Sequence, residues 1–263
     1  MRPTCFEHLF PVALLMVVFA DARIPRLARP PVYGSMLSKR QLSPRYRAVR
    51  SEIVDQHNFY RSTVNPPAEN MEEMKIIQSL GHYTNHAPNK CLLPTSVQPR
   101  VSLVTGLLLQ RWYPWAAKTA QKWANKCLML AHASLEGLND PVMGQCGQNI
   151  FVVSTQVPWS FAIRVWDIEK HNFSYGGIRN NSIGLNGHYT QLVWASSNKV
   201  GCGYSPCQMK FQNTTRVFHN YVCNYCPIGN HPLTRDYPYK SGAPCASCPS
   251  SCRGGRLCSA TGH

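Results

Sequence analysis

Two segments, GHYTQLVW at residues 187–194 and YVCNYCPIGN at residues 221–230, carry the most information about the fold. Aromatic and β-branched residues at and just before the second segment predict a strand over 217–225. The same criterion predicts three further strands, over residues 148–153, 190–194 and 200–204.

Outward from these segments, apolar spacing predicts three helices. A short one is expected over 51–61, with Ser51 as its N-cap. Another is expected over 112–130, with Pro114 in its first turn and one apolar face made of Trp112, Ala116, Ala120, Trp123 and Cys127. The last is expected over 159–172, with Phe161, Val165 and Trp166 buried. Helices that precede a run of strands predict a layered α+β domain.

Composition narrows the class of protein. The chain has 263 residues, 12 of them cysteine, and it is 44% hydrophobic but only 15% charged, which argues against a disordered or coiled-coil protein. The excess of 27 basic over 12 acidic residues gives a formal net charge of +15, which favours polyanionic partners.

The N-terminus predicts the compartment. Residues 9–20 form a short apolar run behind Arg2, and Ala20-Asp21-Ala22 fits a signal-peptidase site, so we expect residues 1–22 to be a signal peptide. No later segment predicts a transmembrane span. We therefore expect a secreted, extracellular, disulfide-bonded protein for which nucleic acid is not a partner. Three sequons fit this compartment, at Asn172, Asn180 and Asn213.

The two ends of the chain differ from the central domain, which we place at 51–230. Residues 23–50 are rich in Arg and Pro and predict a flexible basic arm, in which Lys39-Arg40 is either a processing site or a solvated charge pair. Residues 231–263 are rich in Pro, Gly, Ser and Cys and predict a small disulfide-held tail.

The two opening segments resemble the two signatures of the CAP superfamily, which includes the cysteine-rich secretory proteins. Supporting matches are EIVDQHN at 52–58, PPAENM at 66–71 and WANKC at 123–127, and the tail PCASCPSSC at 244–252 resembles the hinge of the cysteine-rich secretory subgroup. The resemblance implies an α-β-α sandwich with a central antiparallel sheet.

The resemblance also implies a disulfide pattern. It pairs Cys127 with Cys207, Cys146 with Cys226, and Cys202 with Cys223 in the domain, and Cys245 with Cys252 and Cys248 with Cys258 in the hinge. Once Cys5 has left with the signal peptide, Cys91 alone has no partner.

Two departures concern length. Residues 76–111 have no counterpart in the family, and they are either a retained or alternative exon or a surface-loop elaboration. The chain also ends at His263, where the subgroup usually continues into a six-cysteine ion-channel-regulatory module, so channel modulation is not expected.

The third departure is chemical. By motif position, the family's cleft of two histidines and two acids maps to His132, Gln148, Glu169 and His188, and the glutamine stands where the family has Glu. His132 and His188 are candidate ligands for weakly held zinc, because two imidazoles fill half of a tetrahedral site. The alternative is that His188 and Glu169 only hydrogen-bond the walls of the cleft together.

We accordingly expect a secreted, non-enzymatic CAP-domain glycoprotein without an obligatory cofactor. Its expected partners are a cell-surface protein or sulfated glycan, with sterol or lipid as a further ligand class, and the resembled subgroup points to sperm maturation or sperm–egg interaction. The alternative function is a weak zinc-dependent hydrolase working through His132, Glu169 and His188.

Overall fold

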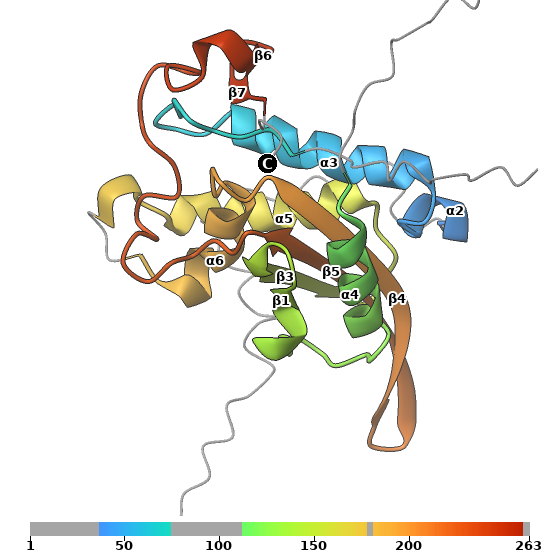
Figure 1. Cartoon of the computed structure of the whole chain (residues 1–263). Helices are drawn as coiled ribbons and strands as arrows, with labels where there is room; N and C mark the ends of the chain where they lie inside the picture. Colours follow the sequence, from blue (N-terminus) through green and yellow to red (C-terminus); the bar gives the residue numbers. More distant parts are fainter. Residues whose placement is uncertain (1–36, 75–111, 178–180, 260–263) are drawn as a thin grey trace, which may run out of the picture.

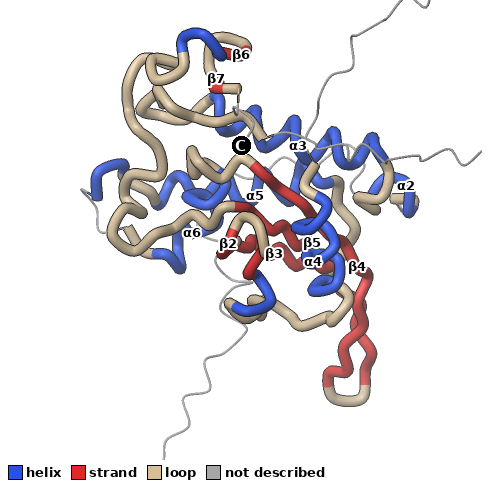
Figure 2. Tube along the Cα trace, viewed as in Figure 1, coloured by secondary structure: helices blue, strands red, loops and turns tan. Residues whose placement is uncertain are grey.

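The computed structural model describes residues 37–74, 112–177 and 181–259 (Figures 1 and 2). The expected signal peptide, the arm up to residue 36, the 76–111 insertion with Cys91, and the sequon asparagine Asn180 lie outside these residues. Within them, no helix has the length and apolar character needed to cross a membrane.

The central sheet is antiparallel, with strand order β3-β5-β4. Its strands are β3 (Gly147–Val153), β4 (Lys199–Phe211) and β5 (Thr214–Cys226), and Val222 in the middle strand stands opposite Ile150 on one side and Gly203 on the other. The predictions of strands over 148–153, 200–204 and 217–225 are confirmed, although β4 and β5 extend further as a long hairpin that projects from the body (Figure 2).

Alternation along β5 divides the core between the two faces of the sheet. Tyr221, Cys223 and Tyr225 join the large core with α3 (Arg47–Ser62), α5 (Trp159–Ile168) and α6 (Ile183–Leu192). Val222 instead packs with Ala120 and Ala124 of α4 (Pro114–Ala124). Because neighbouring strand residues point to opposite faces, α4 covers one face and the other helices cover the second. This is the expected α-β-α sandwich.

Small residues let α4 lie directly on β4. The helix turns Ala116, Ala120 and Ala124 inward, all fully buried. A Cβ built on Gly203 would stand 2.3 Å from the Cα of Gln121, and one on Gly201 would stand 2.2 Å from the backbone nitrogen of Ala117. Glycine is therefore required at both strand positions.

Three predictions of local structure are wrong or incomplete. Residues 190–194, predicted as a strand, belong mostly to α6, because this segment is buried on nearly all sides and so lacks the polar stripe that marks a surface helix. The helix predicted over 112–130 ends at Ala124, before Cys127, and that over 159–172 changes at Glu169 to a 3-10 turn, η3 (Glu169–Asn172). In α5 the fully buried residues include Ala162, Ile163 and Trp166, whereas Phe161 and Val165 are only partly buried.

The basic arm is also shorter than expected. The first long helix, α3, begins at Arg47 with Tyr46 as its N-cap, and a four-residue helix, α2 (Lys39–Leu42), precedes it. Leu37, Leu42 and Val49 are buried in the main core, so residues 37–50 belong to the folded domain. The sequence pattern missed this because few apolar residues lie among the basic ones.

The tail is bound to the loop that follows α3. It contains η5 (Pro249–Ser251) and a two-stranded sheet of β6 (Cys252–Arg253) and β7 (Leu257–Cys258). The backbone nitrogen of Cys258 donates to Met71 O, and that of Ser247 donates to Glu69 O. A segment with little core of its own therefore gains stability from backbone hydrogen bonds to residues 67–73 and from its two disulfides.

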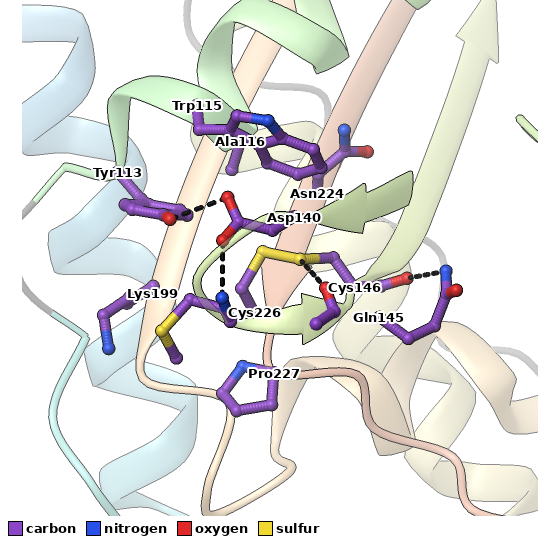
Figure 3. The surroundings of a disulfide bond; sticks show 12 residues. Tyr113, Trp115, Ala116, Asp140, Gln145, Cys146, Lys199, Asn224, Cys226 and Pro227 are labelled. Carbon is purple, nitrogen blue, oxygen red and sulfur yellow. Dashed lines mark hydrogen bonds between the residues drawn. A yellow bond between two sulfur atoms is a disulfide. The ribbon is translucent and has the colours of Figure 1, made fainter. Parts of the chain in front are cut away.

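The structure contains the same five disulfides that the resemblance implies, Cys127–Cys207, Cys146–Cys226, Cys202–Cys223, Cys245–Cys252 and Cys248–Cys258. Figure 3 shows the surroundings of Cys146–Cys226, which packs against Trp115 and Ala116. Beside it, Tyr113 donates its hydroxyl to Asp140 Oδ2 at 2.7 Å, joining the start of α4 to β1 (Asn139–Asp140), which pairs with β2 (Gly144–Gln145). Burial, assisted by this carboxylate, raises the pKa of Tyr113.

Candidate functional site

The four cleft residues come from four different elements. His132 lies in the loop after α4, Gln148 on β3, Glu169 at the start of η3, and His188 in α6. The structure joins them as two hydrogen-bonded pairs, His132 with Gln148 and His188 with Glu169. Burial lowers the pKa of His132, and the two pairs are close enough for a protonated His188 to lower it further.

In the first pair, the proton position on the imidazole follows from the amide of Gln148. Its Oε1 accepts from the backbone nitrogen of Ala133 at 3.0 Å, which identifies it as the oxygen, and its Nε2 donates to Asn224 Oδ1. His132 Nδ1, 3.1 Å from the same Oε1, is therefore the donor. Burial lowers the pKa of His132 and so favours the neutral ring, in which Nε2 carries the lone pair.

In the second pair, Glu169 uses both of its oxygens. Oε1 lies 2.6 Å from His188 Nδ1, and Oε2 accepts from the backbone nitrogens of His188 at 2.9 Å and Tyr189 at 3.1 Å. Since a carboxylate only accepts, His188 Nδ1 carries a proton, and in the neutral ring the lone pair is on Nε2. The ring of Trp166 lies nearly parallel to that of His188, at an interplanar angle of 19° and with centroids 6.4 Å apart.

Two buried asparagines, not predicted as site residues, support the cleft from beneath. Asn149 donates to the carbonyl of His188 at 3.0 Å, tying β3 to α6, and Asn224 links Gln148 to the hydroxyl of Thr119 on α4. Their signal in the sequence is their residue type, because asparagine is depleted in strands and needs hydrogen-bond partners when it is buried.

A divalent cation fits this donor set only in part. Two imidazoles held through Nδ1, with both Nε2 lone pairs left over, are the ligand arrangement that zinc uses. In the described part of the chain, however, no three His, Cys, Asp or Glu side chains form a group able to hold a metal ion. His132 and His188 would thus be the two protein ligands of a weak site, with Gln148 and Glu169 orienting them.

The other predicted site residues are the glycan acceptors. Asn172, in η3, and Asn213, at the tip of the β4–β5 hairpin, are both exposed. Glycosylation at these positions stays a prediction.

Comparison with known proteins places the chain in a family. The family model for CAP, the cysteine-rich secretory protein family, matches residues 105–225. Cysteine-rich secretory protein 3 of Equus caballus is 35% identical over 252 residues, covering 95% of this chain and 82% of the relative, and cysteine-rich secretory protein 2 of Homo sapiens is 33% identical over 250 residues with the same coverage.

Cysteine-rich secretory protein 2 of Cavia porcellus is 32% identical over 250 residues, again covering 95% of this chain and 82% of the relative. Among solved structures, the crystal structure of Na-ASP-1 superposes with a TM-score of 0.53 at 22% identity, covering 81% of this chain and 47% of that one, and supports the fold. The fold, the five disulfides and these relatives together show that the chain belongs to the cysteine-rich secretory protein family of CAP-domain proteins.

Proposed function

We propose that this protein is secreted, glycosylated and non-enzymatic, and that it acts by binding at cell surfaces. Secretion is supported by the N-terminal signal-peptide pattern, by the five disulfides and by relatives that are named as secretory proteins. The resembled subgroup makes the surface of sperm, during maturation or at contact with the egg, the setting that we propose.

The non-enzymatic proposal depends on one observation, which is that neither Glu169 nor Gln148 is available as a general base. Glu169 already accepts hydrogen bonds on both oxygens from His188 and Tyr189, so it is placed to orient an imidazole rather than to activate a water. Gln148, where the family has Glu, supplies no charge and no base. Neither side chain is therefore placed to act as a general base in hydrolysis.

The second candidate function is a weak zinc-dependent hydrolase. It is favoured by one observation, the two Nε2 lone pairs that the hydrogen bonds of His132 and His188 leave over. Bound zinc would act as a Lewis acid at this position. In this function the two imidazoles would hold the metal, and Glu169 would keep His188 in place.

The two candidates are separated by one comparison. The full chain is secreted from mammalian cells as wild type, as His132→Ala/His188→Ala, and as the matched control His171→Ala/His231→Ala, whose histidines are exposed outside the cleft. Each protein is assayed for hydrolysis of a fluorogenic peptide library with and without a chelator, and for saturable binding to sperm. We expect equal binding by all three proteins and no hydrolysis above background. Hydrolysis that is lost with the chelator and in the cleft variant alone would establish the hydrolase instead.

A further inference from the structure

A second concave site is lined by residues of α2, α4 and β4, three elements that lie close together in Figure 1. It is a groove of about 950 Å³. One wall comes from α2, the loop after it and the first turn of α3, and the other comes from α4 and β4. No residue of the His/Gln/Glu cleft lines it.

The described lining of the groove has several cationic side chains and no acidic one. Five of the described residues that line it are cationic and none is acidic: Lys39, Arg45, Arg47, Arg50 and Lys118. Between Leu37 and Arg50 the sequence has no Asp or Glu. Within the described part of the chain, none of the five side chains forms an ion pair. Cations gathered in a concave surface focus the potential and attract an anion more strongly than the same charges spread apart.

The arrangement of the cations follows from local structure. Arg47 and Arg50 are three residues apart in α3 and so project from the same side of the helix, and Lys118 lines the facing wall. Both arginines stand in the first turn of α3, at the positive end of the helix dipole, where a cation is unfavourable by about 0.3–1 kcal/mol. An anion bound in the groove would relieve this repulsion.

A buried donor without a partner belongs to one of the lining residues. Arg50 is half-buried, and its Nε is a buried atom that has no hydrogen-bond partner within the described part of the chain. Buried N–H groups are nearly always paired, so an unpaired guanidinium donor in a cationic groove indicates a missing acceptor. Sulfate and phosphate oxygens match the guanidinium fork in geometry and charge.

We infer that this groove is a binding site for a sulfated polysaccharide. Three large apolar residues of the lining, Leu37, Leu42 and Trp112, are 7%, 1% and 5% exposed and cannot insert into a bilayer. The cations line both walls of the groove, and Gln121, which also lines it, is held by hydrogen bonds to Tyr204 and Asn125. A linear sulfated chain can enter a concave groove, whereas a flat anionic membrane cannot. This inference rests on the proposed function, because it names the partner through which the protein would bind at cell surfaces.

The test measures the affinity of the full-length protein for heparin at about 0.15 M and at higher salt. The groove variant Arg45→Gln/Arg47→Gln/Lys118→Gln is compared with Arg164→Gln/Lys210→Gln/Arg253→Gln, which removes the same charge from exposed positions outside the groove. We expect the groove variant to bind heparin at least tenfold more weakly. We also expect the slope of log affinity against log salt to become shallower by about 2, because fewer cation–sulfate contacts release fewer counterions on binding. The control variant should stay within about twofold of wild type.

Arg50→Lys provides a finer test, since lysine keeps the charge but has no Nε–H donor. We expect it also to weaken heparin binding, and Arg164→Lys to leave it unchanged.

Three outcomes would overturn the inference. The first is an equal loss in both triple variants, which would mean attraction by net charge alone. The second is equal binding to fully desulfated heparin. The third is tighter, groove-dependent binding to phosphatidylserine vesicles, which would assign the groove to membranes. In each case, saturable binding to sperm without hydrolysis would still leave the proposed function standing.

Discussion

His188 Nδ1 and Glu169 Oε1 lie 2.6 Å apart, and the second oxygen of the same carboxylate holds the backbone nitrogens of His188 and Tyr189. Glu169 therefore fixes both the position of the imidazole and the location of its proton. The pair gives the cleft its defined shape and leaves His188 Nε2 as an acceptor.

Replacing Glu169 with Gln should reverse the tautomer of His188. The amide offers one acceptor oxygen for the backbone nitrogens and one NH2 group, which would then face His188 Nδ1 and donate to it. We expect the His188 proton to move to Nε2, and 15N chemical shifts of the imidazole to show the exchange. His171→Gln serves as a control without effect on these signals. A His188 ring that keeps its proton on Nδ1 would show that the carboxylate does not control it.

Restoring a carboxylate with Gln148→Glu should strengthen zinc binding. The new carboxylate would accept a hydrogen bond from His132 Nδ1, which increases the basicity of the ring, and its negative charge would attract a cation. Supporting residues of this kind alter metal affinity by about 10–100-fold. Asn224 can rotate its amide to donate to the new carboxylate. Calorimetry with zinc alone measures the effect, with Gln145→Glu, a half-buried glutamine outside the cleft, as the matched control. Equal affinity in wild type and Gln148→Glu would remove Gln148 from the account of the cleft.

Stability should fall between about pH 6.5 and pH 4 because of His57. Complete burial, with a smaller contribution from Arg61, lowers the pKa of His57 to about 4, against the hydrogen bond that its ring donates to Ile53 O. Above pH 6.5 the ring is neutral in both the folded and the unfolded chain. As the pH falls toward 4, His57 takes up a proton mainly in the unfolded chain. The free energy of unfolding is therefore about 3 kcal/mol lower at pH 4 than at pH 7.

Urea unfolding at a series of pH values measures this dependence. His57→Gln should be less stable at pH 7 but should lose much of the slope, whereas His171→Gln should keep it. An unchanged slope in His57→Gln would assign the acid sensitivity to other groups.

Arg61 is expected to be the most sensitive single position in the fold. Its guanidinium is fully buried and donates five hydrogen bonds to backbone carbonyls, two to Glu72 and one each to Leu192, Trp194 and Ala195. Lysine has three donors on one atom and cannot span these carbonyls, so Arg61→Lys should cost about 3 kcal/mol or more. The midpoint of urea unfolding tests this, with the exposed Arg164→Lys as control; equal midpoints would contradict the assignment.

Much of the fold could be predicted from sequence because alternation and helical spacing survive wherever one face is buried. The strands β3, β4 and β5 show this pattern, and so does α4. The pattern failed at residues 190–194, where Leu192 and Val193 are fully buried and no polar face marks a helix. It also failed at residues 37–50, where few apolar residues lie among many cations.

The candidate cleft could be predicted only through family resemblance. His132, Gln148, Glu169 and His188 are dispersed over 57 residues, and no local rule places them together. Arg61, which satisfies four carbonyls, and Asn224, which supports Gln148, were missed because their roles depend on partners distant in the sequence.

Contact between α4 and β4 should be intolerant of a single methyl group. Gly203→Ala would place its Cβ against the backbone of Gln121, which cannot move without shifting the helix, and we expect a loss of about 1–3 kcal/mol. Gly137→Ala is the control, because its Cβ would meet Ser134 Oγ at 3.4 Å and Ala133 Cβ at 3.9 Å, both ordinary contact distances. Similar unfolding midpoints for the two variants would contradict the close packing described here.

The most direct test of the proposed function is saturable binding of the secreted full-length protein to sperm, measured together with peptide hydrolysis on the same preparation. The account predicts that wild type and His132→Ala/His188→Ala bind equally and that neither hydrolyses peptide above background. Absence of saturable binding, combined with hydrolysis that a chelator abolishes, would contradict it.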